Sequence, residues 1–289
     1  MIDTLQLKIA AEKAIQTAHK AVAPLKLFAT SFSAAESTQG SAIRVPVFNI
    51  GDAAEFNADS NNYAGTTQDV AGVDVNLDKH FVKSVFYTDR DMVECNVDFF
   101  TEAGRGIGEQ LGRAAVKQVT GMLTNAQITK STVLTLANFA DKKNIANLYK
   151  VADDNDLNPA DVVLLLTPAA FAAVLANLDA DVYGGNEAIR DGMIPGLYGF
   201  GGVVMANTLA SGLNGVMVHK EAIGIAGRYL APDASAYSEV GQITDEATGL
   251  TIGFRRFAIP ETGKRYIAGE MLYGAALLQK DKIVLIKNA

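Results

Sequence analysis

The feature that most constrains this chain is a polar stretch, residues 51–72, set between two β-forming runs. The stretch is rich in Asp, Asn, Gly, Ser and Thr and has little to bury. Before it, residues 42–48 form a short β-type run. Pro46 confines this run to a sheet edge or an irregular strand, because proline has no N–H to give to a ladder. After it, Val73, Val75 and Leu77 alternate with polar residues, the pattern of a half-buried strand.

The β pattern continues through Phe81, Val85 and Tyr87. We therefore expect residues 41–90 to form an extended two-stranded arm with a polar tip. A lone two-stranded ribbon is only marginally stable in water. A ribbon of this length is expected to lie on another surface, and a neighbouring subunit is a natural candidate.

Residues 97–125 give the strongest helix prediction, because apolar residues recur at every fourth position from Phe99 to Leu123. Five glycines nevertheless lie inside this stripe, and each costs about 1 kcal/mol relative to alanine in a helix. They indicate a long helix whose backbone is closely approached by a packed sheet or by neighbouring chains, with local kinking as the alternative. The five are Gly104, Gly106, Gly108, Gly112 and Gly121.

The N-terminal region predicts a helix over residues 3–22. Asp3 is the expected N-cap, and Gln6 three residues later completes a capping-box pattern. Pro24 ends the helical spacing. The apolar face of this helix must pack on its own domain or on a neighbouring subunit.

Residues 144–225 predict a compact α/β unit. Residues 162–166 are an unbroken apolar run, as expected of a strand covered on both faces. Thr167 and Pro168 then supply a helix N-cap and a first-turn proline. Residues 202–206 and 215–219 are expected strands, and residues 221–225 are either a short helix or a strand. Residues 228–289 are expected to be rich in β-strands, with a turn at residues 260–264.

Composition fits a folded chain with an acidic surface. The chain has 289 residues, which indicates one large or two modest domains. Of these residues 49% are apolar, enough for a sizeable core with or without additional apolar contact surface. The net charge of −7 and the absence of a dense run of Lys and Arg argue against sequence-specific nucleic-acid binding, which needs a basic surface.

The constellations that support catalysis or metal binding are mostly missing. His19, His80 and His219 fall in different expected elements, and no pair has the spacing of metal ligands. Cys95 is the only cysteine, so no intrachain disulfide is possible, and we interpret it as a small reduced residue. A calcium loop beginning at Asp154 would need Gly and Glu at two positions that hold other residues.

Glycine motifs do not supply a phosphate site either. Residues 104–108, Gly-Arg-Gly-Ile-Gly, resemble part of a dinucleotide fingerprint, but they lie within a helical stripe and no strand precedes them. The glycines of residues 196–202 precede a strand, which is the wrong order for a phosphate cradle. Paired carboxylates of the glycosidase type meet only in space, so the sequence leaves them open. We expect no catalytic, cofactor-binding or metal-binding residues, and no enzyme activity.

No membrane segment is expected. The longest apolar stretch, residues 162–178, is interrupted by Thr167, Pro168 and Asn177 and is shorter than the roughly 20 residues of a membrane span. The N-terminus lacks the basic and apolar regions of a signal peptide. We expect a soluble protein that is made in a cytoplasm and does not bind membranes.

The order of elements resembles that of the major capsid proteins of tailed bacteriophages, the Hong Kong ninety-seven fold, which is also seen in encapsulins. Two similar segments correspond to the strands of the family's E-loop, and three to later strands of its A-domain and closing sheet. In chain order the segments are Gly40-Ser-Ala-Ile-Arg-Val-Pro46; Val73-Asp-Val-Asn-Leu-Asp-Lys-His80 running on to Tyr87-Thr-Asp89; Val163-Leu-Leu-Leu-Thr-Pro-Ala169; Ile194-Pro-Gly-Leu-Tyr-Gly-Phe200 with Val203-Val-Met-Ala-Asn207; and Arg265-Tyr-Ile-Ala-Gly-Glu270.

The resemblance implies an α+β fold in five parts. These are an N-terminal arm (1–40), an extended β E-loop (41–90), the long spine helix of a P-domain with the segment that follows it (91–143), a central α/β A-domain (144–227), and closing β segments of the P- and A-domains (228–289).

The resemblance also implies a structural role. Copies of the chain would self-assemble into hexamers and pentamers of an icosahedral virion capsid in the host cytoplasm. The capsid would enclose double-stranded DNA without binding specific sequences. Because the chain begins almost directly at the N-terminal arm, the resemblance implies a separate scaffolding protein, together with a portal and, as an optional partner, a decoration protein.

Two alternatives remain open from the sequence. One is an encapsulin-like nanocompartment shell, which shares the fold but holds a cargo enzyme. The other, from a different class, is a soluble α/β enzyme whose site is assembled only in space.

Overall fold

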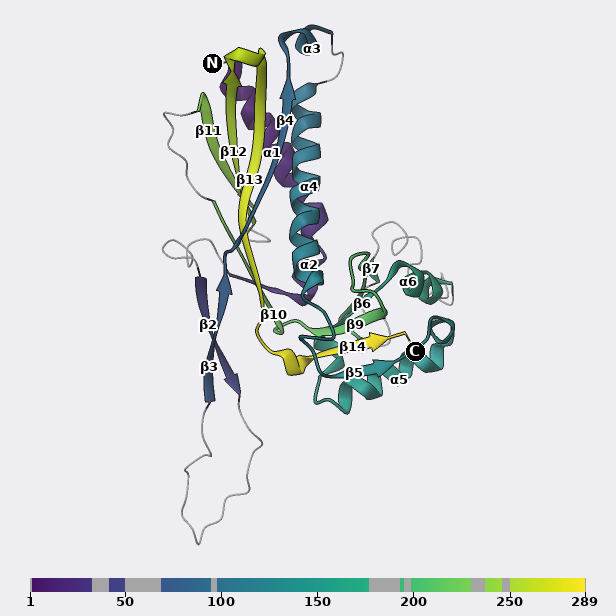
Figure 1. Cartoon of the computed structure of the whole chain (residues 1–289). Coiled ribbons are helices and arrows are strands. Elements are labelled where there is room, and N and C mark those ends of the chain that lie inside the picture. Colours follow the sequence, from purple (N-terminus) through teal and green to yellow (C-terminus); the bar gives the residue numbers. More distant parts are fainter. Residues whose placement is uncertain are drawn as a thin grey trace.

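The computed structural model of the protein describes residues 2–32, 42–49, 69–94, 98–176, 193–194, 199–229, 237–245 and 250–288 (Figure 1). Within these residues the strands form three sheets. The first has the order β1 (Thr30–Phe32), β10 (Ile223–Arg228), β13 (Lys264–Leu277), β12 (Leu250–Ile259), β11 (Glu239–Asp245), with β4 (Lys79–Tyr87) also paired to β13. The second has the order β5 (Ser131–Val133), β14 (Ile283–Lys287), β9 (Leu213–His219), β6 (Val162–Leu166), β8 (Gly202–Met205), β7 (Met193–Ile194). The third is a ribbon of β2 (Ala42–Asn49) and β3 (Asp69–Asn76).

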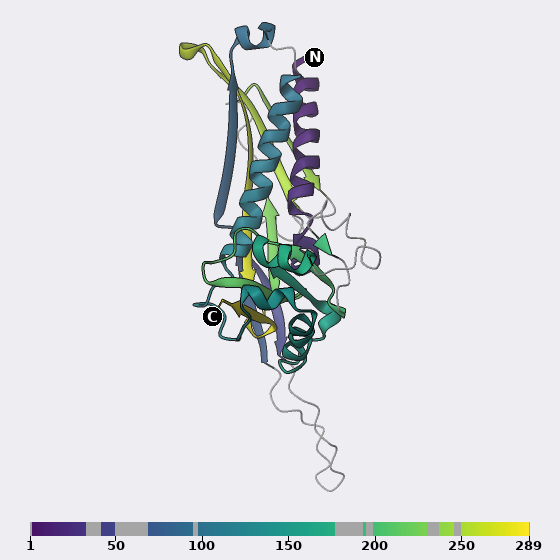
Figure 2. The same cartoon turned by 90° about the vertical axis from the view of Figure 1, so that its right-hand side faces the viewer.

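The helices cover particular faces of these sheets. Long helices α1 (Ile2–Val22) and α4 (Phe99–Gly121) run parallel over one face of the first sheet (Figure 2). Helices α5 (Lys142–Asp153) and α6 (Pro168–Leu175) pack with the second sheet at one end of the elongated molecule, and the ribbon projects beside it (Figure 1). The short elements are α2 (Leu25–Phe28), α3 (Asp89–Glu94) and the 3-10 helices η1 (Leu136–Ala140), η2 (Pro159–Asp161), η5 (Pro260–Thr262) and η6 (Lys280–Lys282).

The predicted long helix is confirmed as α4. It begins after Asp98, whose side chain accepts a hydrogen bond from the backbone N–H of Thr101 and so satisfies a donor that the first turn leaves unpaired. The apolar stripe faces the core, and from Ala103 to Leu123 its members are at most 6% exposed. The stripe therefore fixes which face of α4 is buried.

Three of the five helix glycines form a seam with α1. A Cβ added at Gly108 would overlap the backbone carbonyl of Ala14, so only glycine allows the two helices to approach this closely. The expectation of a close backbone approach is confirmed here, but the expected partner, a packed sheet or a neighbouring chain, is wrong at these three positions: the approaching segment is the chain's own N-terminal helix. The seam pairs Gly104 with Ala10, Gly108 with Ala14, and Gly112 with Ala18; Gly106 and Gly121 face open space.

The N-terminal helix is confirmed, but its predicted cap is wrong. Helix α1 begins at Ile2, which places Asp3 inside the helix and not at its N-cap. The helix ends at Val22, and Pro24 is the N-cap residue of α2. Proline thus marks the break between two helices, as its missing N–H requires.

The two-stranded arm is shorter than the sequence predicts. Strands β2 and β3 pair from Ala42–Asn76 to Asn49–Asp69, and Pro46 lies opposite Gly72 in a ribbon that has no third strand among the described residues. Strand β4, expected in the arm, instead pairs antiparallel with β13 in the first sheet. The expected arm of residues 41–90 is therefore wrong for residues 79–87. Alternating residues indicate a strand but do not indicate its partner.

The second sheet confirms the predicted α/β unit. All five residues of β6 are buried, and the Thr167 side chain caps α6 by accepting from the N–H of Ala170. Two boundaries differ from the expected ones. Strand β10, expected in the A-domain segment 144–227, lies in the first sheet, and β5, expected in the segment 91–143, lies in the second.

The predicted β-rich C-terminal region is also confirmed. The turn at residues 260–264 is η5 followed by Gly263, whose φ of 61° is a left-handed conformation that favours glycine. Strand β13 then runs unbroken for 14 residues and carries the chain from the first sheet towards the second. Short connections join the two sheets between β9 and β10 and between β13 and β14, and a longer one, through α3 and α4, runs from β4 to β5.

Candidate assembly surfaces

The outer face of the first sheet, opposite α1 and α4, carries a strip of aromatic rings. Phe86 of β4 lies 6.1 Å from Tyr266 of β13, and Tyr266 stacks on Phe257 of β12 at 5.1 Å, all as ring-centroid distances. Tyr237, next to β11, extends the strip with its ring 6.0 Å from Phe257. The Phe86 ring is 53% exposed and holds the Lys264 ammonium 4.5 Å above it. These four rings are the aromatic strip.

The strip continues onto an exposed edge. Val82 lies four residues before Phe86 on the same face of β4 and is 55% exposed. Among the described residues β4 pairs only with β13, so no described strand pairs with its other edge. An exposed edge beside large apolar side chains is a common site for pairing with another chain.

A buried carboxylate underlies this face. Glu270 of β13 has a side chain only 6% exposed, and the Arg255 guanidinium of β12 forms an ion pair with it. From the other neighbouring strand, the His80 Nε2 atom lies 3.3 Å from the Glu270 carboxylate. A buried carboxylate is tolerated only when paired, so these two contacts lock β4 and β12 in register around β13.

Arg256 supports the opposite, inner face. Its Nε donates a hydrogen bond of 3.1 Å to the hydroxyl of Tyr87, and its guanidinium lies 6.0 Å from the centre of the Phe100 ring. It also pairs with Glu239 at 3.9 Å. One buried cation thus ties β4, β11, β12 and α4 together. Buried polar contacts therefore join the strands of this sheet on both of its faces.

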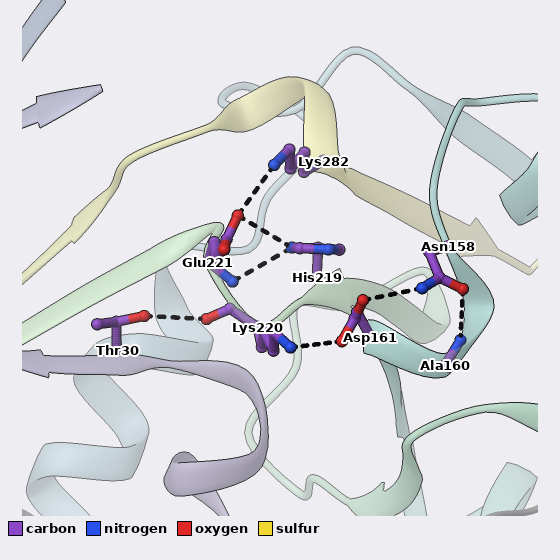
Figure 3. Close-up of polar contacts among 8 residues, drawn as sticks. All are labelled: Thr30, Asn158, Ala160, Asp161, His219, Lys220, Glu221 and Lys282. Carbon is purple, nitrogen blue, oxygen red and sulfur yellow. Dashed lines mark hydrogen bonds and ion pairs between the residues drawn. The ribbon is translucent and has the colours of Figure 1, made fainter. Parts of the chain in front are cut away.

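A polar cluster lies where the chain passes from the second sheet to the first (Figure 3). Lys220 donates from Nζ to the Asp161 carboxylate at 2.5 Å, and its carbonyl accepts from the Thr30 hydroxyl at 3.2 Å. The hydrogen bond from Lys220 holds the pKa of Asp161 below its ordinary value. Lys282 pairs with Glu221 at 3.1 Å and so links the second crossing, β13 to β14, to the first.

His219 sits at the centre of this cluster. Its Nδ1 lies 3.3 Å from the backbone nitrogen of Glu221, and the N–H donates to it, which requires the neutral ring. Burial lowers the pKa of His219, and the nearby Lys282 ammonium acts in the same direction. The histidine is therefore a neutral structural acceptor in the turn between the two sheets.

The three histidines remain apart, each in its own setting. His19 on α1 contacts Asp245 of β11 at 2.6 Å, whereas His80 and His219 lie in the contacts already described. Across the described residues no group of three His, Cys, Asp or Glu side chains is placed to hold a metal ion. Cys95 lies outside these residues. The acidic turn that begins at Asp154 follows α5, and Asp156 takes a φ of 59° there.

Other sequence motifs occupy structural positions. The glycines of residues 104–108 lie within α4, where two of them contact α1, so they form no phosphate loop. Most of the segment 194–200 lies outside the described residues. No helix in the described part of the chain is both long and apolar enough to cross a membrane.

The sequence missed the aromatic strip and the Glu270 cluster. Their members lie on strands far apart in the chain and meet only through strand register, for which a single sequence holds no signal. The sequence held one signal for the strip. Val82 and Phe86 are large apolar residues that alternate with the buried positions of the strand, so they fall on its solvent-facing side.

Comparison with known proteins identifies the family of the chain. A family model described as phage capsid protein matches residues 70–286. No curated protein matches the chain. Among solved structures, the capsid of the cyanophage P-SCSP1u aligns with a TM-score of 0.57 at 16% identity, over 91% of this chain and 87% of that chain.

Two further structures agree. The capsid of a native GTA particle gives a TM-score of 0.58 at 13% identity, over 93% of this chain and 90% of that one. A virus-like particle from Pyrococcus furiosus gives 0.55 at 11% identity, over 96% and 97%. Identities this low show the fold alone. Because the family model spans well over half of the chain, the chain belongs to the phage capsid protein family, and it is a structural protein of the virion with the α+β major capsid fold.

Proposed function

We propose that copies of this chain assemble into hexamers and pentamers that tile an icosahedral capsid around double-stranded DNA. The observation that carries the proposal is the ribbon of β2 and β3, which projects from the body although a two-stranded ribbon is marginal by itself (Figure 1). A neighbouring copy supplies the surface that such a ribbon needs. Closed symmetry then repeats each weak contact many times.

The parts of the chain take separate roles in this proposal. Residues 1–40 act as the N-terminal arm, and the ribbon acts as the E-loop. The first sheet with α4 forms the P-domain, and the second sheet with α5 and α6 forms the A-domain. The aromatic strip and the β4 edge are further contact surfaces on the P-domain.

The charge of the chain supports enclosure of DNA without tight binding. A net charge of −7 repels phosphates at long range, so packaged DNA is held mainly by the walls of the container. The other partners in this proposal are a separate scaffolding protein, a portal and, as an optional addition, a decoration protein, and assembly takes place in the host cytoplasm.

A second candidate function is an encapsulin-like compartment that holds a cargo protein. The similarity to a virus-like particle over 96% of this chain favours it. Nuclease treatment of purified particles, followed by analysis of their contents, separates the two. The first proposal predicts protected double-stranded DNA and no stoichiometric enzyme. Particles that hold a single cargo enzyme and no DNA would support the second.

A further inference from the structure

A groove of about 680 Å³ lies between the C-terminal parts of α1 and α4 and the C-terminal end of β8 in the second sheet. Its lining includes the apolar side chains of Phe28, Val116 and Met205. Met205 is 46% exposed, so the isolated chain leaves apolar surface in water there. Covering that surface with another apolar group is favourable.

The rim of the groove is basic. Lys20 and Lys117 stand on its two helices, and neither ammonium group forms an ion pair within the described part of the chain. Arg113 also lines the groove and pairs with Glu109 at 2.6 Å. The groove therefore has a local excess of positive charge in a chain whose net charge is −7.

The C-terminal end of α5 has the complementary properties. Tyr149 is 44% exposed, and Asp153 lies one helical turn after it on the same face. Asp153, Asp154 and Asp156 are exposed, and none of the three carboxylates forms an ion pair with another described residue. Lys150 is the only cation among residues 149–156, so negative charge is in excess. Tyr149 and the three aspartates are the α5 patch.

The groove and the α5 patch lie on opposite faces of the second sheet. Leu165 of β6 lines the groove, whereas its neighbour Leu164 packs in the apolar cluster that contains Leu148 and Ala152 of α5. Successive side chains of a strand point to opposite faces of its sheet. Figure 1 accordingly places α5 on the far side of the second sheet from α2 and α4. The patch of one copy therefore cannot enter its own groove.

A contact between two different faces of identical chains is head-to-tail. A copy that offers its patch to one neighbour keeps its own groove open for another. Contacts of this kind close into rings when the successive rotations add up to a full turn. Pentamers and hexamers are rings of this type, so repetition of one contact generates either of them.

We propose that the α5 patch of each copy docks in the groove of the next copy around a capsomer. This rests on the proposed capsid function and names the surfaces that join the body of one copy to the body of the next. The Tyr149 ring covers Met205, and carboxylates of the patch pair with Lys20 and Lys117. A DNA backbone pairs with the ammonium groups but leaves the apolar lining in water, so it fits the groove less well.

Cysteine crosslinking between copies tests the contact. In a Cys95→Ser background, shells are assembled from chains that carry both Tyr149→Cys and Met205→Cys and are treated with a short bis-maleimide. The proposal predicts a ladder of linked chains that ends at pentamers and hexamers, because every copy has one partner on each side.

The matched control carries Val133→Cys in place of Tyr149→Cys. Val133 is 60% exposed on β5, which forms the opposite edge of the second sheet from β7 and β8. This control should give no ladder. Intact shells without crosslinks between positions 149 and 205, or with an equal ladder from position 133, would overturn the proposal.

A charge swap gives a second, independent test. The Lys20→Glu, Lys117→Glu variant should form no shells under conditions in which the natural chain forms them. Adding Asp153→Lys and Asp154→Lys to that variant should restore shells. The control, Lys8→Glu with Arg105→Glu, changes exposed cations on the N-terminal halves of the same two helices and should assemble normally.

The outcomes of the charge swap separate the contact from the capsid function. Normal shells from Lys20→Glu, Lys117→Glu would contradict the contact and leave the capsid function standing. Loss of shells that the added lysines fail to restore would also count against the contact, since it assigns the groove to another anion such as DNA or an acidic protein. A natural chain that never forms shells would instead count against the capsid function itself.

Discussion

At the scale of single residues, glycine sets how closely α4 approaches α1. Gly108→Ala should destabilise the fold by about 1–3 kcal/mol, because the new Cβ overlaps backbone of Ala14 and the helices must separate. Gly106→Ala, two residues earlier, faces open space and should stabilise the helix by about 1 kcal/mol. Urea unfolding of both variants checks the pair. Equal effects at the two positions would show that the seam has no part in stability.

The turn between the sheets should make stability depend on pH through His219. Burial lowers the pKa of His219 in the folded state, so the unfolded chain, with a value near 6.5, binds the proton more readily. Stability is therefore full above pH about 6.5 and falls as the pH drops from there towards the lowered folded value. His219→Asn retains an acceptor for the Glu221 N–H and does not titrate.

Unfolding free energies measured between pH 7.5 and 5 check this prediction. The natural chain should lose more stability on acidification than the His219→Asn variant. The carboxylates titrate in both proteins, so the comparison isolates the histidine. An identical pH dependence in the two proteins would contradict a neutral His219 in the folded state.

At the scale of elements, the ribbon should be dispensable for folding and required for assembly. At the base of the ribbon, Ile43 and Val75 pack against the body. From Pro46 and Gly72 outwards, the described residues of β2 and β3 pair only with each other. Replacing residues 46–72 with a short Gly-Ser turn should therefore leave the melting temperature of the monomer nearly unchanged. The same deletion should abolish shells in electron micrographs. Shells of normal size from the shortened chain would refute the role given to the ribbon.

The aromatic strip should likewise matter more to assembly than to stability. Phe86 and Val82 are more than half exposed, so Val82→Ser with Phe86→Ser removes little buried area from the isolated chain. Sedimentation should show a higher protein concentration at the onset of assembly, with unfolding of the monomer shifted by less than about 1 kcal/mol. Ile267→Ser on the buried side of the same sheet is the contrasting variant, and it should unfold the chain.

The sequence predicted elements better than it predicted their partners. The stripe of α4 and the Thr167 cap are local signals, since they depend on residues within one or two turns. The partner of β4 is not local, because Phe81 pairs with Met271 across most of the chain. The same applies to the surfaces: Arg255, Glu270 and His80 come from three strands, and their meeting depends on register that alternation leaves open.

At the scale of the whole molecule, the fold separates stability from assembly. The inner face of the first sheet, α1 and α4 form one continuous apolar core with part of the second sheet. The ribbon, the aromatic strip and the β4 edge lie outside it. A chain built in this way can change its contacts between copies without unfolding. Solved structures share this fold at only 11–16% sequence identity. The fold therefore depends on the pattern of buried apolar positions more than on which apolar residue fills each position.

The most direct test of the central claim is cryo-electron microscopy of the purified chain, alone and together with its scaffolding protein. The account predicts closed shells built from five-fold and six-fold capsomers, with the ribbon of each copy lying on a neighbour. A strictly monomeric species at high concentration under both conditions would contradict it.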